Sequence, residues 1–479
     1  MGAQHSTQNA IAIVGLTVRL PGGMHSPAEF RDMLINKRDG RCEVPETRYN
    51  INGFQQPTKP HHSILTRHGY SCVRIPQCLM AERMHPQQRL LMEIVWECFE
   101  SAGKTDWHRG NIGCFVGSFG EDWLDLAAKD TENSDRYRAV GTGGFALANR
   151  VSYEYDLRGP SIAIQTGCSA SLVCLHEACL ALHAGTCSSA IVTGTNLILG
   201  PSMTTAMADN GVLSPEGICR TFVEKTNGFS HREAEPNLGW IRATGTNFDG
   251  RTPNLTSLCP ESQEAFLRST YARPGISDIN ETALFECHGT ATLMGDKVEA
   301  SVMAKLGACH KILIGAVKPN VGHSEGASGL TSLIKAVLAL ENETILPNIH
   351  FNTPNPEISW TDLRVPTKAL PWPSERAARV SVNSFGIGGS NVHVIVEAPR
   401  AHTTRLVRET APIQQLRVLL VSAQSDSSLQ QRISDVVDYA NSKSSSARDL
   451  DNLAYTLAVK RRHLLRRAFP LKSLSHENC

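Results

Sequence analysis

A cysteine and two histidines stand at matching places in this chain, each just after an apolar stretch and beside a glycine. Cys168 lies in "SIAIQTGCSASLVCLHEAC" (161–179), where the alternation typical of a strand gives way to helical spacing. His288 follows "ALFEC", and His323 ends "KILIGAVKPNVGH". A thiol can act as a nucleophile, and two imidazoles can direct N–H donors at an enolate oxygen. Alone, each residue is more often structural, but three in matching places predict one catalytic site.

The corner that holds Cys168 predicts how its thiol would be activated. A helix start offers unpaired backbone N–H groups and the positive end of the macrodipole, and both favour the thiolate. Gly167 permits a tight corner, and the small residues after Cys168 leave the N–H groups free to bind an oxyanion. Three other cysteines lie within or after the following helix and are interpreted as structural: Cys174, Cys179 and Cys187.

Strands that alternate with helices must position these groups. Buried strands, some with their turns, are predicted at 10–23, 188–196, 283–292, 311–323 and 379–399, and helices at 27–40, 86–103 and 326–342. This alternation is typical of an α/β layered fold with a parallel or mixed sheet. After Pro399 the composition becomes polar, and one strand with amphipathic helices then predicts a small α/β unit.

The composition is that of an ordinary globular protein, with 479 residues, 41% of them hydrophobic and 19% charged. A formal net charge of +1 argues against nucleic acid or an anionic membrane as the main partner. Fourteen cysteines without a secretory signal or a CxxC pair favour reduced thiols in the cytoplasm. His61 and His62 lack further ligands at metal-binding spacing, so no metal is predicted.

Four segments carry a family resemblance, in this order along the chain: "TGCSASL", "ECHGTATLMGD", "KPNVGHSEGASGL" and "VNSFGIGGSNVHVIVE". Over residues 10–399 the sequence resembles the β-ketoacyl synthase (ketosynthase) domain of type I polyketide synthases. "PETRYNINGF" and "ALANRVSYEYDLRGPS" further resemble the iterative, highly reducing synthases of filamentous fungi. Residues 415–469 resemble the linker that joins ketosynthase to acyltransferase, so we expect a synthase truncated after this linker.

The resemblance implies a thiolase-like α/β fold, with two related βαβαβ halves in five layers and a small α/β linker domain. The expected parts are a flexible tail (1–9), an N-terminal half (10–240), a C-terminal half (241–399) and a linker toward a missing acyltransferase domain (400–479). A cytoplasmic homodimer without a bound cofactor is implied. Its acyl and malonyl thioesters would arrive on the phosphopantetheine of an acyl carrier protein, supplied in trans.

The resemblance also implies residue roles in a decarboxylative Claisen condensation, as in polyketide or fatty acid chain extension. Cys168 would hold the acyl chain. His288 and His323 would bind the malonyl thioester carbonyl and promote loss of carbon dioxide. The resulting carbanion would attack the Cys168 thioester, with the backbone N–H groups of Cys168 and Ile387 as the oxyanion hole.

Supporting roles follow from the same resemblance. Lys318 would orient the His323 loop electrostatically, with Glu325 as its partner. Gly386 and Gly388 belong to the "SFGIGGSN" turn (384–391), whose flexible backbone N–H groups suit an oxyanion hole.

The sequence departs from the family at four places. Ala291 replaces a glycine, which is costly if its φ is positive. His85 replaces an aspartate, with the expected loss of a structural hydrogen bond. Segments near 68–84 and 230–238 are shortened. The second shortening would remove a buried strand and leave neighbouring backbone groups unpaired.

Three interpretations compete at this point. A condensing acyltransferase leads, because the cysteine and both histidines are present. The alternative is a catalytically impaired ketosynthase-like remnant or scaffold from a truncated or mis-spliced gene, which the shortened segments favour. A thiolase-like cysteine hydrolase is weaker, because two histidines suit decarboxylation better than activation of water.

Overall fold

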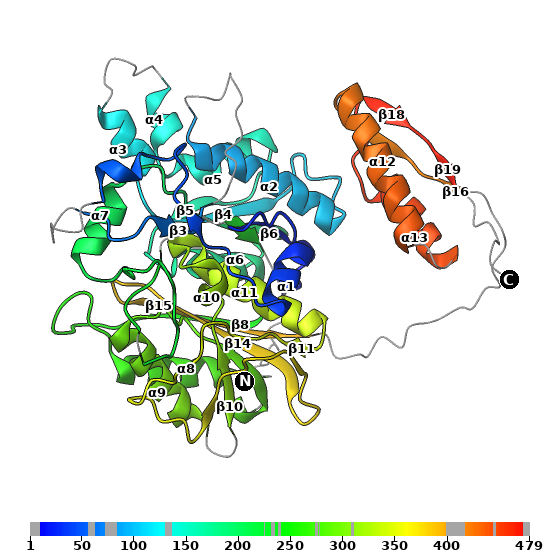
Figure 1. Cartoon of the computed structure of the whole chain (residues 1–479). Helices are drawn as coiled ribbons and strands as arrows, with labels where there is room; N and C mark the ends of the chain where they lie inside the picture. The colour runs from blue at the N-terminus through cyan, green and yellow to red at the C-terminus, as the bar shows by residue number, and fades with distance from the viewer. Residues whose placement is uncertain are drawn as a thin grey trace, which may run out of the picture. The chain divides into compact units, whose positions relative to one another are not determined.

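The chain divides into two compact units, Met1–Val95 with His108–Ala398 and Trp96–Trp107 with Pro399–Cys479. The computed structural model (Figure 1) describes residues 10–55, 63–71, 84–129, 137–224, 226–230, 235–237, 241–273, 276, 278–307, 311–398, 417–443 and 447–472. The expected tail (1–9), the His61–His62 pair and most of the shortened segments lie outside these ranges. No helix within them is long and apolar enough to cross a membrane.

Two sheets form the centre of the first unit. The smaller has the order β5-β4-β6 and is parallel throughout, with strands β4 (Ile112–Ser118), β5 (Ser161–Ile164) and β6 (Ser189–Thr195). The larger has the order β12-β10-β9-β14-β15-β8 and is mixed. Its strands are β8 (Ile241–Phe248), β9 (Thr282–Glu286), β10 (Ile312–Gly315), β12 (Leu363–Arg364), β14 (Ala377–Phe385) and β15 (Ser390–Glu397).

Helices form three further layers around these sheets. Helices α6 (Ala170–His183) and α11 (Ser328–Glu341) lie between the sheets and contact both. Helix α5 (Ala146–Glu154) packs on the smaller sheet, while α8 (Pro260–Tyr271) and α9 (Leu293–Leu306) pack on the larger one. The expected α/β fold with five layers is confirmed.

Shorter elements connect these layers. The remaining helices are α1 (Pro27–Ile35), α2 (Pro86–Ala102), α3 (Asp122–Lys129), α4 (Arg138–Thr142), α7 (Ser202–Asp209) and α10 (Lys318–Val321). Two small antiparallel pairs join β2 (Cys42–Glu43) to β3 (His68–Gly69) and β11 (Thr344–Ile345) to β13 (Leu370–Pro371).

The two central helices are buried because they are apolar on nearly every side. Every residue of α11 from Ser328 to Leu340 is buried. Leu172 and Leu175 of α6 join Leu330 and Leu333 of α11 in one core cluster, together with inward side chains of both sheets. The site residues therefore rest on the most deeply packed part of the molecule.

A pair of glycines allows the central layer to approach the smaller sheet. Gly117 on β4 and Gly194 on β6 are register partners. A Cβ at Gly117 would lie 2.5 Å from the Ser171 Cα, and one at Gly194 would lie 2.7 Å from the Ala327 Cα. Larger residues would push away the starts of α6 and α11, which carry or adjoin the predicted site.

The first predicted strand is shorter than expected. Only Thr17–Arg19 form β1, while Ile11 makes an isolated bridge to Ile241. β1 pairs antiparallel with β7 (Glu235–Asn237), which lies beside β6. Three residues from the shortened segment therefore occupy the region next to β6 and provide β1 with backbone partners.

The second unit contains more strands than the single one predicted. It has the antiparallel pairs β16 (Arg417–Val418) with β19 (Leu471–Lys472) and β17 (Val421–Ala423) with β18 (Arg466–Ala468). Two helices accompany them, α12 (Asp426–Lys443) and α13 (Ala447–Val459). Strands of two or three residues are too short to show a period in the sequence.

The last turns of α2 belong to this second unit. Phe99 stacks on Trp107 with ring centroids 4.5 Å apart, and Arg462 lies over the Trp107 ring. Arg461 Nη1 donates to the Glu100 carbonyl oxygen at 2.7 Å. The sequence predicted the second unit from residues beyond 399 alone, but residues 96–107 also belong to it.

His85 makes a hydrogen bond at the start of α2, at the position where the family resemblance predicts that one would be lost. Its Nδ1 accepts the backbone N–H of Gln87 at 3.2 Å, which satisfies one of the free donors at the helix start. Burial, aided by the Arg89 charge, lowers the pKa of His85 to about 4. The imidazole is therefore neutral at pH 7, as an acceptor must be.

We predict that His85 makes the fold sensitive to acid. In the unfolded chain His85 takes up a proton below its ordinary pKa of 6.5, whereas the folded chain does so only near pH 4. Stability present above pH 6.5 is therefore lost as the pH falls toward 4, by up to about 3 kcal/mol. His85→Asn keeps an acceptor without a titrating group and should flatten this slope.

Urea unfolding between pH 7 and 4 measures the effect. The exposed His25→Asn variant is the matched control and should keep the slope of the parent chain. Equal slopes for the two variants would show that His85 carries no such linkage.

Candidate active site

Cys168 sits in the turn between β5 and α6, after Gly167 with a φ of +66°. Its carbonyl oxygen accepts two hydrogen bonds, from Ser328 Oγ at 3.1 Å and from Ser384 Oγ at 2.9 Å. Ser328 begins α11, and Ser384 lies near the end of β14. Two elements that follow Cys168 by at least 160 positions thus hold the cysteine backbone in place.

His288 follows β9, and its turn is fixed from two sides. The Glu299 carboxylate accepts the backbone N–H groups of His288 at 2.7 Å and Gly289 at 2.9 Å. On the other side, Lys318 Nζ donates to the His288 carbonyl oxygen. These contacts determine where the imidazole can point.

His323 follows α10 and Gly322, which has a φ of +74°. Its backbone N–H donates to the Ser230 carbonyl oxygen at 2.9 Å. The edge of its ring packs on Phe229 with centroids 4.8 Å apart. The imidazole is therefore positioned by packing as well as by the backbone.

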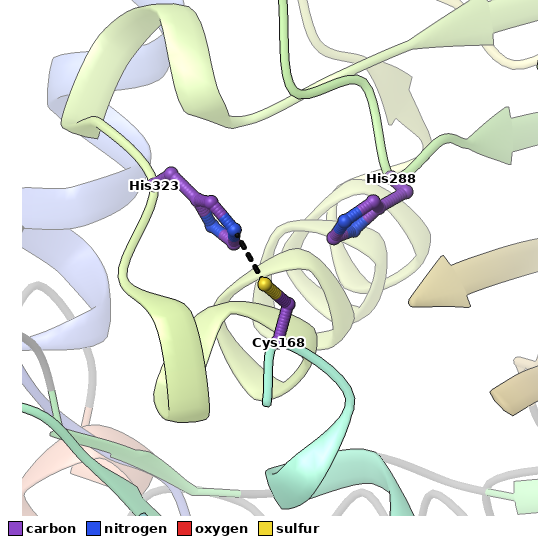
Figure 2. A group of neighbouring side chains, drawn as sticks. All are labelled: Cys168, His288 and His323. Atoms are coloured by element: carbon purple, nitrogen blue, oxygen red, sulfur yellow. Dashed lines mark hydrogen bonds between the residues drawn. The ribbon is translucent and has the colours of Figure 1, made fainter. Parts of the chain in front are cut away.

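The structure brings the three predicted side chains together (Figure 2). His323 Nε2 lies 3.0 Å from Cys168 Sγ. The two imidazole rings are 5.4 Å apart at 85°, and both point toward the sulfur. Each residue has one atom that could bind a metal ion, and these three atoms all lie within 4.8 Å of one another. Cys168 and His323 lie 155 positions apart in the chain, yet they meet with His288 in one cluster.

The protonation state of Cys168 differs from the expectation. Burial raises the pKa of the thiol to about 12, and the Glu325 charge acts in the same direction. The Lys318 charge and the backbone N–H groups of Ile387 and Cys168 lower the pKa without outweighing burial. The expectation of a thiolate created by the helix start is therefore wrong, because loss of hydration dominates.

His323, rather than a low pKa, distinguishes Cys168 from the structural cysteines. Burial also raises the pKa of Cys114 and Cys179 to about 12. Cys168 has a histidine nitrogen at hydrogen-bond distance from its sulfur. Its acylation is therefore coupled to proton transfer in a way that a buried structural thiol is not.

His288 is a neutral imidazole. Burial and the Lys318 charge hold its pKa well below the usual range. A neutral ring carries one N–H donor and no charge, so it can stabilise an oxyanion by hydrogen bonding alone.

Lys318 supports the His288 turn. Its ammonium donates to the His288 carbonyl oxygen. Glu325 is buried and has a φ of +43°, a conformation that is costly for a residue with a Cβ. Its charge raises the pKa of the Cys168 thiol.

The turn between β14 and β15 lies beside Cys168. The backbone N–H groups of Ile387 and Cys168 both lower the pKa of the Cys168 thiol, which places them near its sulfur. A Cβ at Gly386 would lie 2.6 Å from the Thr166 carbonyl oxygen, so only glycine fits there. A Cβ at Gly388 would meet nothing within 4 Å, so space does not require glycine at that position.

Ala291 is in the costly conformation, with a φ of +60°. The strain is about 1–2 kcal/mol for a residue with a Cβ. Its methyl group is fully buried in a cluster with Cys219 and Phe229, which offsets part of that strain by about 0.8 kcal/mol. The turn that follows His288 is thus retained with alanine in the place of glycine.

A buried ion pair lies between α11 and β9, and the sequence patterns did not predict it. Lys335 Nζ on α11 lies 2.7 Å from Glu286 Oε2 at the end of β9, and both side chains are at most 1% exposed. The contact is ionic rather than a well-directed hydrogen bond. It joins the central helix to the strand that carries His288.

Comparison with known proteins agrees with this geometry. Residues 8–234 match the N-terminal domain of β-ketoacyl synthases, 238–352 the C-terminal domain and 354–471 the ketoacyl-synthetase C-terminal extension. The chain therefore belongs to the β-ketoacyl synthase family. Within that family it is a ketosynthase domain of the polyketide synthase type.

Individual relatives show the same assignment. The chain is 44% identical to highly reducing polyketide synthase g433 of Fusarium sp and 43% identical to sphB of Aspergillus fumigatus, over 96% and 98% of its length. It spans about a fifth of those proteins, 19% and 20%. The ketosynthase from module 6 of the Bacillus subtilis 168 bacillaene synthase has a TM-score of 0.84 at 27% identity, over 97% of this chain and 83% of that one. The expected family and fold are confirmed.

We predict that the Lys335–Glu286 pair tolerates loss of both charges but not of one. Lys335→Met leaves the Glu286 carboxylate buried without its counter-ion and should lower the free energy of unfolding by about 3–5 kcal/mol. Adding Glu286→Gln should restore most of that loss. Urea unfolding of the single and double variants checks this, and a single variant as stable as the parent chain would contradict it.

Proposed function

We propose that this chain catalyses decarboxylative condensation of an acyl chain on Cys168 with a malonyl thioester. The observation that carries the proposal is the pair of imidazoles around one sulfur, with His323 Nε2 at 3.0 Å. The acyl and malonyl groups would be carried by phosphopantetheine on an acyl carrier protein, as a substrate arm rather than a resident cofactor.

The first step is acyl transfer to Cys168. The sulfur attacks the incoming thioester carbonyl, the new S–C bond forms and the bond to the carrier sulfur breaks. The thiol proton ends on the departing carrier thiol. The N–H groups of Cys168 and Ile387 stabilise the tetrahedral oxyanion, since both act on the pKa of the reacting thiol and therefore lie near its sulfur.

The second step is decarboxylation of the malonyl thioester. Its C–C bond to the carboxylate breaks, carbon dioxide leaves and the electron pair passes into an enolate. The N–H groups of His288 and His323 donate to the enolate oxygen. A neutral His288 suits this role because it stabilises the enolate without fully protonating it.

The third step forms the product. The enolate carbon attacks the Cys168 thioester carbonyl, the new C–C bond forms and the C–S bond breaks. The sulfur regains a proton from solvent, and the β-ketoacyl product remains on the carrier. Loss of one carbon dioxide and uptake of one proton balance the cycle.

A homodimer is proposed from the edge of the smaller sheet. β5 pairs only with β4 among the described strands, so its other edge has no ladder partner. Ile162 on β5 is 41% exposed, which is unfavourable for an isolated apolar edge strand.

We propose the cytoplasm as the compartment, because all ten described cysteines are free thiols.

The remnant interpretation is not favoured. The backbone of Cys168, the His288 turn and the His323 loop each retain their hydrogen bonds, and a chain without catalytic use has no need to hold them together. A hydrolase would release a free acid, and the assay below reports that product directly.

We predict that Cys168 and the two histidines can be assigned to different steps by mutation. Cys168→Gln should abolish chain extension but leave malonyl decarboxylation measurable. His323→Ala should slow decarboxylation by about 10²–10³-fold, because one enolate donor is lost. Cys168 should still be acylated, but more slowly, because the imidazole beside its thiol is gone. Purified acyl and malonyl carrier thioesters, with carbon dioxide release and mass spectrometry of the enzyme, measure both steps.

Cys174→Ala is the matched control, since it removes a buried thiol of α6 outside the site. It should keep both activities. Normal decarboxylation by His323→Ala would assign enolate stabilisation to His288 alone, and release of free acid would favour the hydrolase.

A further inference from the structure

The same three side chains form a ligand set for a soft or borderline cation. Cys168, His288 and His323 are the single group of three or more Cys, His, Asp or Glu side chains with convergent ligand atoms in the part of the chain that the structure describes. One thiolate and two imidazoles with an open fourth position are a typical donor set for Zn²⁺.

The distances fit a tetrahedral ion after small side-chain movements. Zn–S and Zn–N bonds of ordinary length place the ligand atoms about 3.3–3.6 Å apart. Cys168 Sγ and His323 Nε2 are slightly closer, at 3.0 Å, and the whole set lies within 4.8 Å. The His288 ring packs edge-to-face with His323 and Phe385, and it would have to shift against them to complete that geometry.

Carboxylates near the site oppose the added charge. Glu299 accepts the backbone N–H of His288, and the Glu325 charge acts on Cys168. Both side chains are buried. Their negative charges partly balance the positive charges of the Lys318 ammonium and of the added divalent ion.

We propose that Cys168, His288 and His323 bind one Zn²⁺ and that this binding reversibly closes the site to acylation. The Cys168 S–H bond breaks, its proton passes to solvent and a Zn–S bond forms, with no change of oxidation state. Water takes the fourth position. Because the sulfur lone pair and both imidazoles are then engaged, the metal-bound chain has no free nucleophile.

Metal binding is tested on the full chain by protection of Cys168 from iodoacetamide. Alkylation is followed by peptide mapping at increasing free Zn²⁺ set by a chelator buffer. At zinc tenfold above its dissociation constant, the alkylation rate of Cys168 should fall about tenfold, and EDTA should restore it. An alkylation rate that does not change with zinc would overturn the proposal.

Cobalt identifies the ligands independently. Co²⁺ bound at the site should give a sulfur-to-cobalt charge-transfer band in the near ultraviolet. Cys168→Ala should lose this band and one bound equivalent of metal, whereas Cys174→Ala should keep both. In His323→Ala the alkylation rate of Cys168 without zinc serves as that variant's own reference, and added zinc should no longer lower this rate. A band that persists in Cys168→Ala would place the metal elsewhere and refute the proposal.

These measurements need no carrier protein and no condensation. Zinc protection in a chain that fails to condense would uphold the metal site and reject the proposed function. Condensation that zinc does not inhibit would uphold the proposed function and reject the metal site.

Discussion

The Glu299 carboxylate is the contact on which the rest of the site depends. It is buried, and burial raises its pKa, yet it accepts hydrogen bonds from two backbone N–H groups of the His288 turn and from Asn383 Nδ2 at 2.9 Å. His393 in turn contacts Asn383 at 2.7 Å. A polar group so far from water is stable only with its partners in place, so α9, β14 and β15 constrain one another.

Hydrogen bonds between distant segments also position the other parts of the site. The Cys168 carbonyl is held by serines from α11 and β14, and the His288 carbonyl by a lysine from α10. Each reactive side chain is thus positioned by an element distant in sequence. Movement of one turn would break hydrogen bonds in another, which favours a rigid, preorganised arrangement over an adjustable one.

The sequence revealed the reactive residues more readily than their supports. Cys168, His288 and His323 each interrupt a regular apolar pattern with a polar group, which is a local signal. Glu299, Asn383 and Lys335 lie inside regular helices and strands, and their significance depends on what lies across the layers. The pKa of Cys168 was misjudged for the same reason, because burial is a tertiary property that a helix start does not show.

Short elements were similarly hard to foresee. The three-residue β7 and the strands of the second unit carry no period long enough to detect. Lys318 shows another limit, since a motif places the lysine beside a histidine loop but does not say which carbonyl it reaches.

Trp96–Trp107 belong to the second unit, so these residues are synthesised long before the rest of that unit. Arg461 contacts Glu100 across 361 positions, so at ordinary translation rates about 20–70 s separate the appearance of the two residues. During that interval Trp107 lacks its contact with the Arg462 guanidinium, and Glu100 lacks its hydrogen bond from Arg461. The Phe99–Trp107 stack of the nascent chain therefore remains without these partners until residues beyond 460 have been made.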